Sequence, residues 1–158
     1  MRTLLVLLSI HHKNTEKIAN VMARILDAQI RTPREASPDE LQDFDLVGFG
    51  SGIYDEKHHR ALLEFADRIP QVTNRNAFIF STSGVTTYAD AFHTPLRERL
   101  QSKGYVIIGE FNCHGFNTNS FLRFFGGMNK ARPNAEDLRN AEAFAQSLKQ
   151  HPGVTPTS

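Results

Sequence analysis

Short uninterrupted apolar runs alternate along the chain with longer segments whose apolar residues recur every three or four positions. Runs of the first kind are typical of strands buried on both faces of a parallel sheet, and they lie at 4–8, 46–50, 77–81 and 105–109. The periodic segments predict amphipathic helices at 14–26, 57–69, 92–100 and 138–148. We also expect a weak strand at 28–31 and a short helix at 38–41. This alternation predicts an α/β fold whose parallel sheet carries helices on both faces.

Two segments depart from the alternation. Pro95 falls within the third helical segment, where it either kinks the helix or starts it with Thr94 as the N-cap. Residues 110–133 show no period, and an irregular segment of this length is usually functional. Its phenylalanines predict buried core, a lid over a ligand or a dimer contact, and they are Phe111, Phe116, Phe121, Phe124 and Phe125. We expect one domain over residues 1–150 and a flexible tail over 151–158.

Composition narrows the class of protein. The 18 basic and 17 acidic residues are well mixed and leave a net charge of +1, which gives no case for nucleic acid or a membrane surface. No apolar run approaches the roughly 18 residues that span a bilayer. The single cysteine, Cys113, excludes an internal disulfide. We therefore expect a cytoplasmic protein, as a monomer or homodimer.

In open parallel sheets, ligands bind beyond the carboxyl ends of the strands. The segments that follow Ser9, Gly50 and Ser81 at such ends are rich in Ser, Thr, Gly, Asn or His. The first of them leads directly into the helix at 14–26, and a helix N-terminus offers unpaired N–H groups and a positive dipole end to a phosphate. An ordinary capped turn is the alternative interpretation of this loop.

The sequence excludes three common classes of phosphate-binding site. The P-loop pattern G-x-x-x-x-G-K-[ST] does not occur in the chain. The glycines at 48, 50 and 52 lack the G-x-G-x-x-G spacing and follow the wrong strand for a dinucleotide fold. A phospho-acceptor receiver domain needs carboxylates at strand ends where Ser9 and Gly50 stand. Metal binding is not supported either, because the pairs His11-His12, His58-His59 and Cys113-His114 lack ligand spacing.

Several motifs, taken in order, resemble the flavodoxin-like FMN-binding family. They are Ser9-Ile-His-His-Lys-Asn-Thr-Glu16, Gly50-Ser-Gly-Ile-Tyr54 with Lys57-His-His59, Ser81-Thr-Ser-Gly84, the run 109–118 and the run 126–130. The resemblance covers nearly the whole chain. It implies a flavodoxin-like three-layer α/β/α sandwich with a five-stranded parallel sheet in the order 2-1-3-4-5.

The same resemblance implies where FMN would bind. Its phosphate would be surrounded by Ser9, His11, His12, Lys13, Asn14 and Thr15. One side of the isoalloxazine ring would be lined by Ser51, Gly52, Ile53 and Tyr54, and its pyrimidine edge by Thr82, Ser83 and Gly84. Three further residues would lie near the ring, judged only by their position in a loop after a strand: Asn112, Cys113 and Phe116. Gly52 would allow a peptide to reorient on reduction, and Tyr54 is the aromatic neighbour that would lower the flavin potential.

The implied function is electron transfer by bound FMN to or from a redox partner protein. One alternative is an FMN-dependent NAD(P)H or quinone reductase, whose partner would be a small oxidant such as a quinone; another is a flavin-free interaction module.

The sequence departs from the family pattern in two ways. His11-His12-Lys13 makes the phosphate loop bulkier and more basic, and a chain near neutrality lacks the strongly acidic surface of many flavodoxins.

Overall fold

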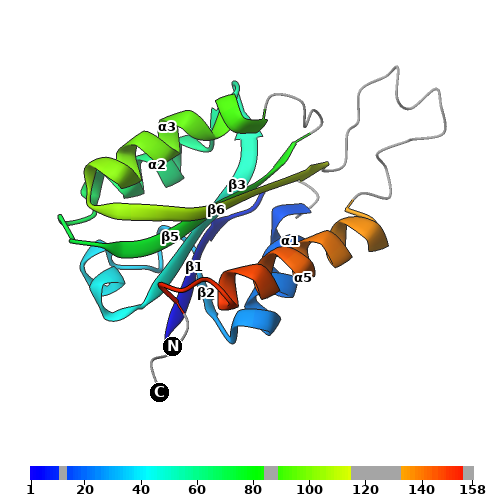
Figure 1. Cartoon of the computed structure of the whole chain (residues 1–158). Helices are drawn as coiled ribbons and strands as arrows, with labels where there is room; N and C mark the ends of the chain where they lie inside the picture. The colour runs from blue at the N-terminus through cyan, green and yellow to red at the C-terminus, as the bar shows by residue number, and fades with distance from the viewer. Residues whose placement is uncertain (11–13, 84–88, 115–132, 155–158) are drawn as a thin grey trace.

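The computed structural model describes residues 1–10, 14–83, 89–114 and 133–154. Among these residues, five strands form a parallel sheet in the order β2-β1-β3-β5-β6 (Figure 1). Their bounds are β1 (Thr3–Leu8), β2 (Gln29–Arg31), β3 (Leu46–Tyr54), β5 (Arg75–Ser83) and β6 (Tyr105–His114). Counted along the chain without the short β4, this is the predicted order 2-1-3-4-5, so the predicted topology is confirmed.

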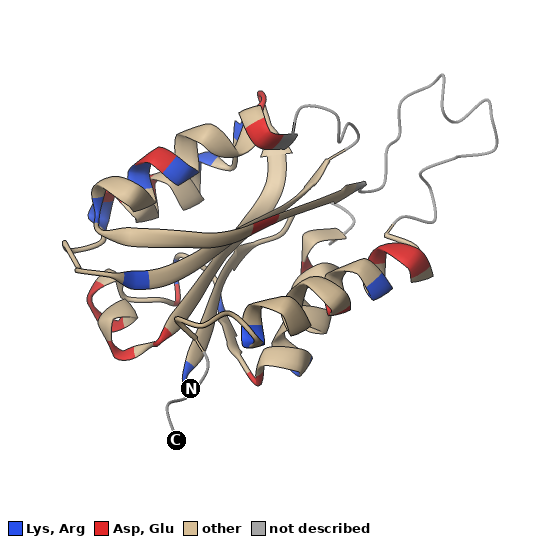
Figure 2. Cartoon of the chain, in the orientation of Figure 1, with Lys and Arg blue, Asp and Glu red and all other residues tan. Residues whose placement is uncertain are grey.

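Helices cover both faces of the sheet, which confirms the three-layer sandwich (Figure 1). One layer holds α1 (Asn14–Leu26) and α5 (Ala135–Lys149), and the other holds α2 (Arg60–Arg68) and α3 (Ala89–Ser102). A short 3-10 helix, η1 (Pro38–Asp43), replaces the helical turn expected at 38–41. Two apolar clusters, one on each face of the sheet, form the core. Charged residues of both signs are interspersed along the helices (Figure 2).

Local chemistry explains how α5 starts and excludes the start that was expected for α3. Asn134 and Asp137 form a capping box at the start of α5, because each side chain accepts from the other residue's backbone N–H at 2.9 Å. Of the two roles expected for Pro95, the start of a helix is wrong, since α3 already begins at Ala89. Thr94 is no N-cap either, because its hydroxyl bonds back to the Asp90 carbonyl at 3.3 Å.

The second predicted helix starts later than expected. Its first residues, Lys57–His58, instead form strand β4, which pairs antiparallel with the end of β3. The strand expected to end at Gly50 therefore continues to Tyr54, and the turn is Asp55-Glu56, with φ of 51° and 63°. The hairpin forms because the His58 ring is fully buried and bonds the Phe80 carbonyl, a tertiary contact that periodicity does not reveal. His59 then caps α2, as its Nδ1 accepts from the Ala61 N–H at 3.0 Å.

Two further boundaries differ from expectation. Strand β6 extends to His114, so the first residues of the segment predicted to be irregular pair in register with the end of β5. Phe111 lies beside Phe144 of α5, with ring centroids 5.5 Å apart, and the other four phenylalanines of that segment are outside the described residues. Residues 151–154, assigned to the tail, pack on the domain: Val154 is buried, and Asn76 donates to the Gly153 carbonyl at 3.0 Å.

Candidate functional site

The carboxyl ends of the four long strands meet in one cross-strand row. Leu8 of β1 pairs with Ser51 of β3, Ser51 pairs with Ser81 of β5, and Ser81 pairs with Asn112 of β6. Every strand end that was predicted to carry site residues therefore lies at the same edge of the sheet. His11, His12, Lys13, Gly84 and Phe116 were predicted for this site too, and they lie outside the described residues.

At the end of β1, the start of α1 is tied to the neighbouring strands. The Ser9 hydroxyl accepts from the Glu16 N–H at 3.2 Å, which satisfies one of the open donors in the first turn. Thr15 is buried, and its hydroxyl lies 2.7 Å from that of Thr82 at the end of β5. The Asn14 side-chain oxygen is buried and has no hydrogen-bond partner among the described residues. Open N–H donors and an unpaired acceptor together suit a phosphorylated ligand that also carries hydroxyl groups.

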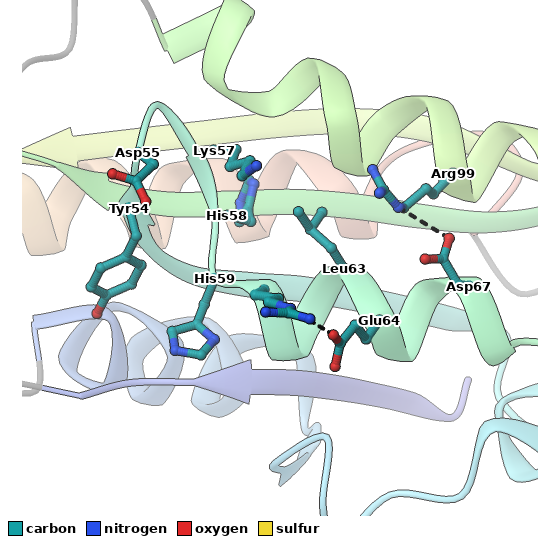
Figure 3. Close-up of a pocket in the computed structure, with 10 residues that line it drawn as sticks. Tyr54, Asp55, Lys57, His58, His59, Leu63, Glu64, Asp67 and Arg99 are labelled. Carbon is teal, nitrogen blue, oxygen red and sulfur yellow. Dashed lines mark hydrogen bonds and ion pairs between the residues drawn. The ribbon is translucent and has the colours of Figure 1, made fainter.

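The end of β3 presents an aromatic pair. Ser51 is fully buried; its oxygen accepts from the His59 N–H at 3.0 Å and its hydroxyl donates to the Gly52 carbonyl at 2.7 Å. The Tyr54 ring meets His59 edge-on, 5.2 Å between centroids, and partial burial raises the pKa of Tyr54 (Figure 3). Tyr54 also folds back over Gly52, where an added Cβ would lie 3.1 Å from the phenol oxygen. Gly52 therefore provides the space that this ring occupies.

A hydrogen-bonded network that sequence reasoning missed lies beneath the ends of β5 and β6. The Ser81 hydroxyl is 2.6 Å from His93 Nε2, and His93 Nδ1 is 2.9 Å from Glu110 Oε1. Arg97 donates to the same carboxylate through Nε and Nη2, each at 2.8 Å. Partial burial opposes ionisation of Glu110, yet hydrogen bonds from His93 and Arg97 lower its pKa to about 2.

His58 completes this region from the side of the β3–β4 hairpin. Its ring packs against His93 with centroids 4.9 Å apart, and its Nε2 donates to the Phe80 carbonyl at 3.0 Å. Burial, followed by the neighbouring His93, lowers the pKa of His58 to about 3. The ring is therefore neutral at physiological pH, and its buried Nδ1 has no partner among the described residues.

A serine, a histidine and a carboxylate in this order have the connectivity of a nucleophilic triad. Ser81 nevertheless has no exposed surface, and its oxygen also accepts from Asn112 Nδ2 at 2.7 Å. A carbonyl substrate has no approach to that oxygen, so the arrangement does not act as a nucleophile. The one sequence signal for His93 was its spacing from Leu96 and Leu100, which places all three on the buried face of α3.

Two pockets adjoin these residues. A pocket of about 680 Å³ lies beside the hairpin and α2, as Figure 3 shows, and it is lined by Tyr54, Asp55, Lys57, His58, His59, Arg60, Leu63, Glu64, Asp67 and Arg99. Its charges are mostly paired, Arg60 with Glu64 at 2.8 Å and Arg99 with Asp67 at 3.0 Å. A smaller pocket of about 230 Å³ is lined by Asp90, His93, Glu110, Phe111 and Asn112.

The described part of the chain shows neither a metal-binding cluster nor a membrane-spanning helix. Among these residues no group of three or more His, Cys, Asp or Glu side chains is arranged to hold a metal ion. No helix in the described ranges is long and apolar enough to cross a membrane.

Comparison with known proteins identifies the family. A model of the flavodoxin domain matches residues 5–113. The uncharacterized protein MJ0298 of Methanocaldococcus jannaschii is 48% identical over 148 residues, which cover 94% of this chain and 98% of that protein.

Solved structures share the fold at low sequence identity. Oxidised Flavodoxin 2 from Bacillus cereus has a TM-score of 0.73 at 16% identity, over 95% of this chain and 99% of that one. A flavodoxin from the domain Archaea has a TM-score of 0.64 at 13% identity, over 95% and 97% of the two chains. General stress protein 14 of Treponema denticola, solved in complex with FMN, has a TM-score of 0.65 at 10% identity, over 94% and 99%. With its fold, its family match and these relatives in agreement, the chain belongs to the flavodoxin domain family.

Proposed function

We propose that this protein binds FMN non-covalently at the carboxyl edge of its sheet and transfers electrons to or from a redox partner protein. The observation that carries the proposal is the start of α1. There the unpaired, buried oxygen of Asn14 lies next to Thr15, and Thr15 is fixed to Thr82 across the site. Membership of the flavodoxin family and the FMN complex of the Treponema denticola relative support the same ligand.

The residues at this edge fit the three parts of FMN. The open N–H groups of the first turn of α1 suit the phosphate, with Ser9 and Thr15 at either side and His11, His12 and Lys13 as predicted further contacts. Asn14 was expected at the phosphate, but its unpaired side-chain oxygen is an acceptor. It therefore suits a ribityl hydroxyl, which would supply the donor that this oxygen lacks.

The ring would lie over the ends of β3 and β5. Gly52 and Tyr54 would line one side of it, and Thr82 and Ser83 would border its pyrimidine edge. When bound, FMN supplies the one- and two-electron chemistry, and the protein supplies orientation and electronic tuning. Tyr54 tunes the potential in this account, because an electron-rich ring beside reduced flavin disfavours the added charge.

A second candidate function is reduction of a small oxidant such as a quinone. The observation that favours it is the pocket of about 680 Å³, which shares Tyr54 with the proposed flavin site. A carrier needs no such space beside the flavin, whereas a reductase needs room for its substrate there.

The visible spectrum of the purified protein tests the proposal. We expect flavin absorbance as purified, or its appearance after FMN is added and excess is removed. A protein that takes up no FMN would contradict both redox functions and leave a flavin-free interaction module. If FMN is bound, rapid reduction by NAD(P)H with turnover of a quinone would replace the carrier with the reductase. A flavoprotein that is not reduced by NAD(P)H and does not turn over a quinone would support the electron carrier.

A further inference from the structure

Tyr54 lies on the face of the sheet that carries the start of α1. It stands two residues beyond Gly52 in β3, and residues two apart in a strand project from the same face. Gly52 pairs with Thr82 of β5, and the Thr82 hydroxyl is 2.7 Å from that of Thr15 at the start of α1. The Tyr54 ring is therefore on the same face as the residue proposed to bind the phosphate.

The orientation of the Tyr54 ring depends on packing. Burial raises the pKa of its phenol, and the phenol oxygen makes no hydrogen bond to a described residue. On one side the ring lies against Gly52, where an added Cβ would be 3.3 Å from the nearest ring carbons. On the other side it meets the His59 ring at an interplanar angle of 84° (Figure 3). Gly52 and His59 are thus the two neighbours that confine it.

His59 is itself held at two points. Its backbone N–H donates to the oxygen of the fully buried Ser51 at 3.0 Å, which ties it to β3. Its ring Nδ1 accepts from the Ala61 N–H at 3.0 Å, which makes the side chain the N-cap of α2. Because both the backbone and the ring are bonded, the imidazole keeps a fixed place beside Tyr54.

Capping α2 does not in itself require a histidine. Asparagine, aspartate, serine and threonine are the usual N-caps, and each could accept the same N–H with a smaller side chain. A smaller side chain would not make the ring contact that His59 makes with Tyr54. The contact with Tyr54 therefore gives a reason for an imidazole at this position that capping does not.

We propose that His59 is a positioning residue of the flavin site, which holds the Tyr54 ring beside the isoalloxazine ring of FMN. In the proposed function Tyr54 disfavours the charge added on reduction, so a ring that is held in place keeps the potential of bound FMN low. His59 acts through Tyr54 in this account. The inference rests on the proposed FMN site and on the role of Tyr54 there.

Three substitutions of His59 separate its ring from its cap. His59→Asn keeps an acceptor for the cap and removes the ring, His59→Phe keeps a ring and removes the acceptor, and His59→Ala removes both. The urea midpoint of the FMN-free protein reports the cap. The dissociation constant of reduced FMN divided by that of oxidised FMN, measured by anaerobic titration, reports how far binding lowers the flavin potential.

The two measurements should respond to different substitutions. We expect His59→Asn to keep the natural urea midpoint and to lower the ratio of dissociation constants about two- to tenfold, the range that an aromatic pair contributes. His59→Phe should lower the midpoint and keep the ratio within about twofold of the natural value. His59→Ala should lower both. In a Tyr54→Leu background His59→Asn should leave the ratio unchanged, because no ring is left to position.

A measurement on the FMN-free protein tests the contact by itself. Burial raises the pKa of Tyr54, so a ring released by His59→Asn should have a lower pKa than in the natural protein. Carbon-13 NMR of labelled tyrosines follows this titration, and loss of the signal in Tyr54→Leu assigns it. A Tyr54 pKa that is the same in the natural protein and in His59→Asn would refute the positioning role.

The outcomes also separate this inference from the FMN site. If FMN does not bind, the FMN site is wrong and the inference falls with it. If FMN binds and His59→Asn leaves the ratio unchanged, the FMN site stands and the positioning role is refuted. Equal decreases in His59→Asn and His59→Phe would refute it as well, because the cap would then be the cause. A decrease that persists in the Tyr54→Leu background would show that His59 does not act through Tyr54.

Discussion

Thr15 and Thr82 are the residues that connect the start of α1 to the far side of the proposed site. Their hydroxyls are 2.7 Å apart, and both side chains are almost completely buried. One of the two hydroxyls donates to the other, so one proton remains for a further acceptor. In our account that acceptor is a phosphate oxygen of FMN, reached from Thr15 at the helix N-terminus.

We therefore expect Thr15→Ala to weaken FMN about tenfold or more, since a hydrogen bond to a charged group is lost, and to weaken riboflavin much less. Fluorescence titration with both ligands measures the difference. Thr3→Ala is the matched control, because Thr3 is an equally buried threonine of β1 near the opposite end of the sheet. Equal losses for FMN and riboflavin in Thr15→Ala would mean that the phosphate lies elsewhere.

His58 gives a pH dependence whose sign can be worked out. Its pKa falls from 6.5 to about 3 on folding, mainly through burial, so between these values the unfolded chain binds a proton that the folded chain does not. The stability due to neutral His58 is thus fully present above pH 6.5 and is lost as the pH falls. We expect the free energy of unfolding, measured by urea denaturation, to decline between pH 7 and 5 less steeply in His58→Phe. If the His58 ring were protonated in the folded protein, His58→Phe would keep the slope of the natural protein, and that result would contradict the prediction.

At the scale of elements, the β3–β4 hairpin is the least expected part of the fold. Asp55 and Glu56 both adopt positive φ, the geometry of a type I′ turn, which favours Asn-Gly or Asp-Gly. A left-handed glutamate is strained by about 1–2 kcal/mol, and glycine removes that strain at a smaller entropic cost. The hairpin matters to the site because it carries Tyr54 on one side and His58 on the other.

Glu56→Gly should therefore raise the free energy of unfolding by about 0.5–1 kcal/mol, as measured by urea denaturation. Glu56→Ala removes the same charge and retains the left-handed strain, so it should give no gain. A Glu56→Gly protein no more stable than Glu56→Ala would show that the turn is not strained.

The elements that the sequence predicted correctly are those with a strong local pattern. The apolar runs of β1, β3, β5 and β6 and the periods of α1 and α5 needed no tertiary information. Strand β4 and the late start of α2 could not be predicted, because they depend on a buried bond between His58 and the Phe80 carbonyl. Strand β6 extends beyond its apolar run for the same kind of reason: Glu110 and Asn112 are held by partners on α3 and β5.

The site likewise has residues that the sequence could predict and residues that it could not. The strand ends carrying Ser9, Ser51 and Thr82 could be predicted, since polar residues at the ends of parallel strands meet at one edge. His93 and Glu110 could not be paired, because one lies on a helix and the other on a strand with no motif between them. The strand order came from the family resemblance and not from the pattern of residues.

At the scale of the whole molecule, FMN binding should stabilise the fold. A ligand that binds only the folded chain adds about 2.7 kcal/mol at a hundredfold excess over its dissociation constant, which is roughly 5–10 °C in the melting temperature of a domain of this size. Thermal unfolding at increasing FMN concentrations should show a progressive rise, with a smaller rise for riboflavin. A melting temperature that does not move with saturating FMN would contradict binding to the folded state.

The central claim is that the carboxyl edge of the sheet holds FMN, and an experimental structure of the protein with FMN tests it most directly. We predict the phosphate at the N-terminus of α1 within hydrogen-bond distance of Thr15, and the ring over the ends of β3 and β5 beside Tyr54. A phosphate bound away from α1, or a ring seated in the pocket between Lys57 and Arg99, would contradict the account.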